Sequence, residues 1–324
     1  MKFTKKTADQ LGVVKLPSSN NVVMFNCIRL TIAVVSVTTV IYSYVRHERL
    51  KEQLSSLQNQ LTREEMIASS LYRDLNSDVD TTREHQKTAQ ENSCKALNAK
   101  VCSDANRYNN KAQKAIKSYN ITFRKLQEEL PAYKKRYDKC STLEKKIRQI
   151  QKELNLDEES FSEVTINNYS KLELKVNLIS KKDTMVKLKV QKAQKYADAL
   201  YDEYYRLMLL IVTGECGDTY YPSTDQYYVM NVIENRVKSK YYPDTVREVI
   251  FQPGQYQPTW DGSWSKTPNN RTKKNVKKYL RGKIETDMPE NVVYQAMFTQ
   301  GDYVWRHVSN PVDSGHWYCV QATK

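Results

Sequence analysis

Residues 207–215 read LMLLIVTGE, and residues 227–237 read YYVMNVIENRV. The first stretch has the composition of a buried helix and ends in a carboxylate, Glu215. A carboxylate at the end of such a run lies where the core meets a cleft, and partial burial there disfavours its charged form. Its pKa is then raised toward neutrality, as a glycosidic general acid requires. The alternative is an ordinary surface carboxylate just beyond a helix end.

Further motifs follow in order from about residue 207 to residue 319. They are Gly214-Glu215, Asp218, Asn235-Arg236-Val237, Tyr242-Pro243, Thr245-Val246, residues 249–256 (VIFQPGQY), Asp261-Gly262 and Gly315-His316-Trp317-Tyr318-Cys319. In this series the chain resembles the SleB-type cell wall hydrolases, a family that includes spore-cortex-lytic enzymes and many phage relatives. The resemblance covers the last third of the chain only, and the chain is in keeping with a phage or prophage origin.

The resemblance implies a lysozyme-like α+β catalytic domain, here placed at 192–324, that cleaves the glycan strands of peptidoglycan. Family members act as lytic transglycosylases or muramidase-type hydrolases, and both reactions stay open. The sequence departs from the family in two places. The usual Glu-x-x-Gly-Glu is one residue shorter at Glu215-Cys216-Gly217-Asp218, and the aromatic-rich segment before the terminal His is replaced by residues 298–307.

The candidate site residues combine the chemistry of acid catalysis with that of sugar binding. A glycosidase usually needs two carboxylates, whereas a lytic transglycosylase needs one, and Asp218 either supplies a second carboxylate or orients the loop. One group of candidates is a polar and aromatic run in a Pro/Gly-rich loop, and a second lies around Tyr294, Gln295 and Trp305. Both groups suit sugar stacking or plain loop packing. We predict Glu215 as the catalytic acid/base. The predicted substrate-binding or supporting residues are Asp218, Asn235, Arg236, Gln252, Gln255, Tyr256, Trp260, Gln300 and His316.

Two other functions compete with glycan cleavage. Cys216 with His316 or His307 as base would make a thiol peptidase acting on peptidoglycan stems, although the residues around Cys216 do not form a typical nucleophile turn. A non-catalytic wall-binding protein would need no Glu215. The domain has only His307 and His316 and no HExxH spacing, so we predict no metal and no other cofactor.

Only residues 22–45 are apolar enough to suggest a membrane-spanning segment. Lys2, Lys5, Lys6 and Lys15 precede it, and no small-residue cleavage site follows it. The pattern predicts an uncleaved signal anchor with residues 1–21 in the cytoplasm and the rest of the chain outside, facing the cell wall.

Residues 46–157 predict a helical stalk. Leucines recur in steps of four and three between Leu50 and Leu75, and a similar seam runs from Leu126 to Leu154. Pro131 ends or kinks the helix, so the stalk either folds back on itself as a hairpin or bends there. Residues 78–93 are nearly all polar and predict fraying. The stalk is either a soluble spacer or a coiled coil that forms a homo-oligomer. Within the linker at 158–191, the alternation of Leu172, Leu174, Val176 and Leu178 predicts a β-hairpin. The predicted fold is mainly α.

The net charge and the absence of nucleic-acid-binding motifs limit the choice of partners. A net charge of +14 suits an acidic envelope polymer. No zinc-finger spacing, RNP-like motif or phosphate loop is present, so nucleic acid is not predicted as a partner. Peptidoglycan glycan strands and the membrane are the predicted partners. Six cysteines are no disulfide framework. The resemblance places the terminal Gly-His segment near the acidic site, which leaves a Cys216–Cys319 disulfide or two free thiols open.

Overall fold

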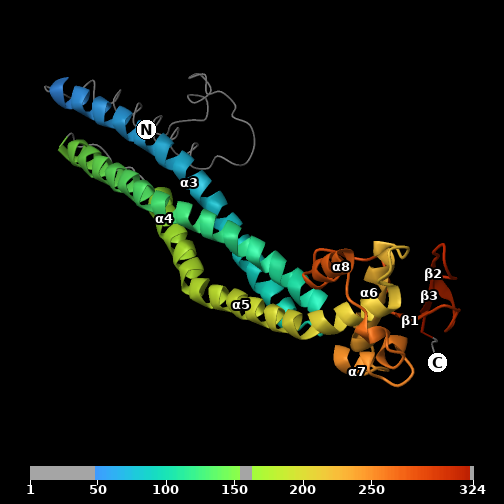
Figure 1. Cartoon of the computed structure of the whole chain (residues 1–324). Coiled ribbons are helices and arrows are strands. Elements are labelled where there is room, and N and C mark those ends of the chain that lie inside the picture. Colours follow the sequence, from blue (N-terminus) through green and yellow to red (C-terminus); the bar gives the residue numbers. More distant parts are fainter. Residues whose placement is uncertain (1–47, 154–162, 322–324) are drawn as a thin grey trace. The chain divides into compact units, whose positions relative to one another are not determined.

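The computed structural model describes residues 48–153 and 163–321, which are mainly helical (Figure 1). Three long helices come first: α3 (Glu48–Leu97), α4 (Cys102–Glu153) and α5 (Glu163–Cys216). Four residues, 98–101, connect α3 to α4. The chain divides into two compact units, one of residues 1–81 and 122–178 and one of residues 82–121 and 179–324. Each long helix therefore contributes residues to both units.

In the first unit, α3 and α4 pack as an antiparallel pair. Leu54 and Leu61 of α3 form one apolar cluster with Cys140, Leu143, Ile147 and Ile150 of α4. Glu64 accepts from Arg136 and Lys139, and Asp78 pairs with Lys125, so numbers rise on one helix as they fall on the other. The two predicted leucine seams thus meet within one chain. α4 continues through Pro131, where the sequence predicts a bend or an end.

The polar stretch at 78–93 is helical to Leu97, which corrects the expected fraying. One face of this stretch is buried and consists of small and polar side chains, among them Val79, Thr82, Gln86 and Ala89. Gln86 donates to the backbone carbonyl of Ile179 in α5 at 3.0 Å. A buried side-chain amide that is hydrogen-bonded costs little, so a polar helix face can pack here.

The β-hairpin predicted within 158–191 is wrong, because residues 163–216 form the continuous helix α5. Leu172 and Val176 are buried, whereas Leu174 and Leu178 are exposed. Two apolar stripes, one facing inward and one facing solvent, interleave along the helix and imitate a period of two. The alternation of apolar and polar residues is present in the sequence, but here it belongs to a helix and not to a strand.

The predicted membrane-spanning helix is not supported. Across the described ranges, no helix is long and apolar enough to cross a bilayer. Residues 22–45, to which the prediction applied, lie outside those ranges.

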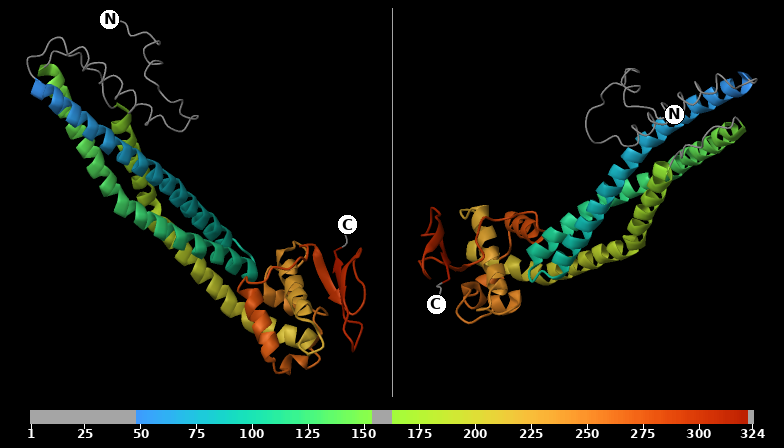
Figure 2. Two further views of the ribbon diagram at one scale, coloured as in Figure 1. Left: turned by 90° about the horizontal axis from the view of Figure 1, so that it is seen from above. Right: turned by 180° about the vertical axis from the view of Figure 1, so that it is seen from behind.

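The second unit holds the remaining elements around α6 (Ser223–Lys238), which contacts both α8 (Asn270–Leu280) and the sheet (Figure 2). α7 (Val246–Ile250) and two 3-10 turns, η1 (Gln257–Thr259) and η2 (Ser263–Ser265), lie between α6 and α8 in the chain. The strands are β1 (Val292–Ala296), β2 (Val304–Val308) and β3 (His316–Val320). They form an antiparallel sheet in the order β1-β3-β2.

The core of this unit explains why the end of α5 is apolar. Met208, Ile211 and Val212 are fully buried against Val229, Met230 and Ile233 of α6. Val101 and Cys102, from the α3–α4 connection and the start of α4, belong to the same cluster. On the other side of α6, Tyr228 and Val232 pack against Val292, Tyr318 and Val320 of the sheet. Burial of this kind contributes about 25 cal/mol per Å² of apolar surface.

Candidate active site

Glu215 lies in the last turn of α5, one residue before the helix ends at Cys216. The residue before it, Gly214, lies against Pro258 of η1: a β-carbon at position 214 would approach Cγ of Pro258 to 2.5 Å. Glycine is therefore required for the loop after α7 to come close to the helix end. The side chain of Glu215 is partly buried beneath this loop, at the boundary predicted from the sequence.

The environment of Glu215 raises the pKa of its carboxyl to near neutrality. Burial raises the pKa of Glu215 to about 7, the charge of Asp261 adds to the rise, and the charges of His316 and Arg236 oppose it. Nε2 of Gln295, in β1, donates a hydrogen bond to Oε2 of Glu215 at 3.2 Å. The other side-chain atom of that amide, Oε1 of Gln295, is buried without a hydrogen-bond partner among the described residues.

His316, the first residue of β3, is buried and held by a carboxylate. Its Nδ1 lies 2.8 Å from Oδ2 of Asp225, which is fully buried in the first turn of α6. Tyr318 donates to the other oxygen of Asp225 at 2.7 Å, and the ring of Tyr221 stacks on the imidazole. Burial by itself lowers the pKa of His316, but the hydrogen bond and charge of Asp225 outweigh it, so the pKa is raised.

Sequence reasoning missed Asp225. It lies in a polar run at the start of α6, where acidic residues are common because they favour helix N-termini. Its pairing with a histidine 91 positions away leaves no local trace in the sequence.

Asn235 and Arg236 tie α6 to β1. Nδ2 of Asn235 donates to the carbonyls of Pro289 and Val292, both at 2.9 Å, and Nε of Arg236 donates to that of Val293 at 2.7 Å. The guanidinium of Arg236 also lies 5.2 Å from the ring centre of Tyr256. Both side chains thus hold the strand that carries Gln295 against the helix and the loop near Glu215.

The loop at 251–265 places its predicted sugar-binding residues in different environments. Tyr256 is buried, and its hydroxyl has no hydrogen-bond partner within the described ranges; the same is true of Oε1 of Gln252 and of Nη1 of Arg236. Burial raises the pKa of Tyr256 to about 12. By contrast, Gln255 is exposed, and Trp260 exposes 58% of its surface. Unpaired buried polar atoms are unusual in folded proteins, and three of them lie here around one loop.

Asp218 lies near Glu215 in the sequence, and Asp261 lies near it in space. Both carboxylates accept hydrogen bonds from other residues. Oδ1 of Asp261 accepts from the amide and hydroxyl of Ser263, which lower the pKa of this exposed carboxyl. Asp218 is exposed and accepts from the hydroxyl of Tyr220 at 3.1 Å. Asp218 therefore lies in the loop after α5, on its solvent side.

The remaining predicted residue, Gln300, lies near Cys319, whereas Cys216 directly follows Glu215 at the end of α5. The backbone amide of Gln300, in the β1–β2 loop, lies 3.5 Å from Sγ of Cys319. Cys216 and Cys319 are both buried free thiols, and no disulfide joins them in this structure. Burial raises the pKa of the Cys216 thiol far above its ordinary value.

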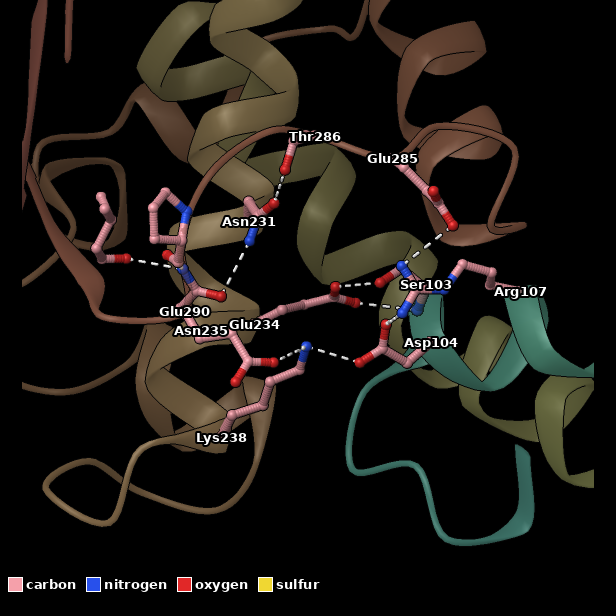
Figure 3. Close-up of polar contacts among 12 residues, drawn as sticks. Ser103, Asp104, Arg107, Asn231, Glu234, Asn235, Lys238, Glu285, Thr286 and Glu290 are labelled. Carbon is pink, nitrogen blue, oxygen red and sulfur yellow. Dashed lines mark hydrogen bonds and ion pairs between the residues drawn. The ribbon is translucent and has the colours of Figure 1, made fainter. Parts of the chain in front are cut away.

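The first turn of α4 belongs to the same unit as Glu215 and is hydrogen-bonded to α6 (Figure 3). The buried carboxylate of Glu234, in α6, accepts from the backbone amide of Ser103 at 3.1 Å and from its hydroxyl. Tyr279 of α8 donates to the same carboxylate at 2.9 Å. Lys238, one turn further along α6, bridges Asp104 at 2.6 Å and Glu290 at 3.4 Å. Residues 102–107 are thus anchored in the same core as the site.

Comparison with known proteins identifies this part of the chain. A family model described as Cell Wall Hydrolase matches residues 221–316. The solved structure of the catalytic domain of the Bacillus cereus SleB protein is 30% identical, over 36% of this chain and 90% of that one, with a TM-score of 0.28. No curated protein matches the chain. Through its C-terminal domain, the chain belongs to the SleB-type cell wall hydrolase family.

Proposed function

We propose that the C-terminal domain cleaves the glycan strands of peptidoglycan, with Glu215 as general acid and then general base. The observation that carries the proposal is the carboxyl of Glu215 at the end of α5, with a pKa of about 7 and a hydrogen bond from Gln295. A carboxyl with such a pKa is about half protonated near pH 7, so it can donate its proton to a leaving oxygen and then accept one.

The proposed reaction is that of a lytic transglycosylase. Glu215 protonates the glycosidic oxygen as the bond to the anomeric carbon breaks. The carboxylate that remains then accepts the proton from the C6 hydroxyl of the same sugar, whose oxygen bonds to the anomeric carbon. The products are a strand with a free hydroxyl and a strand with a 1,6-anhydro end. Glu215 returns to its protonated form, and no water is consumed.

The positions of the other carboxylates favour this route over hydrolysis. Hydrolysis by inversion or retention requires a second carboxylate that activates water or attacks the sugar. Asp261 is bound by Ser263, and Asp218 faces solvent, so neither is presented as a free base beside Glu215. Gln295 suits this reaction, because its N–H group stabilises the carboxylate of Glu215 that exists between the two proton transfers.

The test is digestion of purified sacculi by the full chain and by Glu215→Gln, followed by mass spectrometry of the released muropeptides. We expect anhydro-sugar ends from the parent and a loss of roughly two or more orders of magnitude in rate from the variant. Reducing ends without anhydro products would replace transglycosylation with hydrolysis. Activity of Glu215→Gln at the parental rate would overturn the proposal.

The thiol peptidase is the weaker alternative. A nucleophilic cysteine requires a thiolate that substrate can reach. Cys216 is fully buried, its pKa is raised, and the side chain of His316 is engaged by Asp225. Cys216→Ser is therefore expected to retain sacculus cleavage. A binding protein without catalysis is distinguished by the same digestion, since it would leave the glycan intact.

A further inference from the structure

Helix α8 carries a row of lysines on its solvent side. Lys273, Lys274, Lys277 and Lys278 are all exposed. At 100° per residue they fall within an arc of about 140° on the helix surface. The buried residues of the helix occupy the opposite arc: Thr272, Asn275, Val276, Tyr279 and Leu280. These four side chains form the lysine face of α8.

The lysine face lacks the neutralising partners that other lysines of this chain have. None of its four ammonium groups forms an ion pair with a residue in the described ranges, and α8 itself contains no Asp or Glu. On the long helices, by contrast, Lys87, Lys125 and Lys187 each have an acidic partner four residues away.

This arrangement costs stability. Lys273 and Lys277 are four residues apart, as are Lys274 and Lys278, and like charges at that spacing destabilise a helix by roughly 0.2–0.5 kcal/mol per pair. Salt screens the repulsion only in part, because neighbouring lysines on one face lie within a Debye length of about 8 Å. A polyanion laid along the face would remove the repulsion, so the charge pattern is complementary to such a ligand.

The lysine face is also held rigidly next to the candidate site. The side chain of Asn269, which caps α8, donates to the carbonyl of Gly217 at 2.6 Å. Arg271, in the first turn, donates to the carbonyls of Asp218 and Thr219. These three acceptors are in the loop that begins two residues after Glu215. A polymer bound to α8 would therefore be kept close to the loop that follows the catalytic acid.

We propose that the lysine face of α8 binds a phosphodiester-linked anionic polymer attached to the peptidoglycan. The choice of a wall polymer rests on the proposed function, because that function brings the domain to the wall. The choice of phosphate rests on the lysines, which bind phosphate as point charges and without the bidentate geometry that favours arginine. The polymer would hold the enzyme on its insoluble substrate while leaving the site free to act on the glycan.

The experiment measures binding in the full chain carrying Glu215→Gln, so that the wall is not cut. The ligands are sacculi with their phosphodiester polymers intact and the same sacculi stripped of them by hydrofluoric acid. One variant replaces all four lysines of the face with Gln. Its matched control replaces Lys135, Lys145, Lys146 and Lys152 of α4, which are exposed and form no ion pair with described residues. Both variants lose the same four charges.

We expect the lysine-face variant to bind intact sacculi at least about tenfold more weakly at low salt, with a shallower salt dependence, and the control to change less than about twofold. Arginine at all four positions should preserve binding, which separates charge from folding. The parental protein should bind stripped sacculi no better than the lysine-face variant does.

Three outcomes would overturn the inference: an equal loss in the variant and its control, equal binding to intact and stripped sacculi, or tighter lysine-dependent binding to duplex DNA or to phosphatidylglycerol vesicles than to the isolated polymer. Cleavage is measured separately, on stripped sacculi with Glu215 in place. The lysine-face variant should cut these at the parental rate, so a failure of polymer binding is distinguishable from a failure of the glycan-cleaving function.

Discussion

Gln295, in the strand β1, donates a hydrogen bond to Glu215, in the last turn of α5, across 3.2 Å and 80 positions of sequence. The hydrogen bond lowers the pKa of Glu215, whereas burial raises it. Removing the side-chain amide of Gln295 should therefore raise the pKa of Glu215. We expect Gln295→Met to shift the alkaline limb of the rate profile to higher pH, because the carboxylate loses a donor. The rate at the optimum should fall by roughly tenfold or more. A pH profile of sacculus cleavage measures both effects, and an unchanged alkaline limb would contradict the assigned contact.

The raised pKa of Glu215 also predicts that catalysis and stability oppose each other at this position. A carboxyl with a pKa near 7 when folded and near 4.3 when unfolded stabilises the fold fully below pH 4. That contribution is lost as the pH rises through 7, because the folded protein must then hold a buried charge. Glu215→Gln removes the charge. We expect the variant to be more stable than the parent at pH 8 by on the order of 1 kcal/mol, with a smaller difference at pH 5. Urea denaturation at the two pH values tests the sign.

The pair formed by Asp225 and His316 predicts a pH dependence of the same sense, but through a charged pair and not through a buried neutral acid. Because Asp225 raises the pKa of His316, the charged pair stabilises the fold at low pH, and this contribution fades as the pH rises through the pKa of the folded imidazole. Asp225→Asn should lower the pKa of His316 and cost more stability at pH 5.5 than at pH 9. An NMR titration of His316 measures the first effect. Tyr318→Phe is the control, since it removes a hydrogen bond to Asp225 but leaves the charge.

The contacts of Glu234 predict that the start of α4 stabilises the catalytic unit. A fragment beginning at residue 192 would leave the buried Glu234 without Ser103 and the core without Val101 and Cys102. Tyr279 still donates to Glu234 in the fragment, but the loss of both bonds from Ser103 and the cavity left in the core each cost on the order of 1–5 kcal/mol. We expect this fragment to unfold at lower urea concentration than the full chain.

In the full chain, Ser103→Ala removes the hydroxyl bond to Glu234 and should reproduce part of the loss, about 1 kcal/mol. Ser93→Ala is the control. Its hydroxyl bonds only within its own helix, to the carbonyl of Ala89, so its loss should cost less. A 192–324 fragment as stable as the intact protein would show that residues 98–107 are dispensable.

How far the sequence predicts this structure depends on the range of the interactions. Glu215 is recognisable because an apolar run and its terminal carboxylate are adjacent in the chain. The leucine seams of α3 and α4 are recognisable for the same reason, and both are buried where heptad spacing places them. Their partner is not recognisable: a seam specifies a facing helix but not whether that helix belongs to the same chain.

Errors arose where one local pattern fits two structures. Leu172 and Leu174 alternate in burial on a helix with two apolar stripes, and the same alternation fits a strand. The role of Asp225 and the contact of Gln295 with Glu215 are not predictable for a different reason, because the partners lie 91 and 80 positions away. A polar residue at a helix start or on a strand has many ordinary explanations, and only the folded chain shows what it contacts.

The close approach of Gly214 and Pro258 restricts how this domain can diverge. Any side chain at 214 would place its β-carbon 2.5 Å from Cγ and 2.6 Å from Cβ of Pro258, so a larger residue at 214 is tolerable only if the loop at 258 has already changed. The order of substitutions is then constrained: the loop must yield first, and the helix can follow. Among descendants of this domain, positions 214 and 258 should covary, and libraries that diversify α5 alone should return glycine at 214.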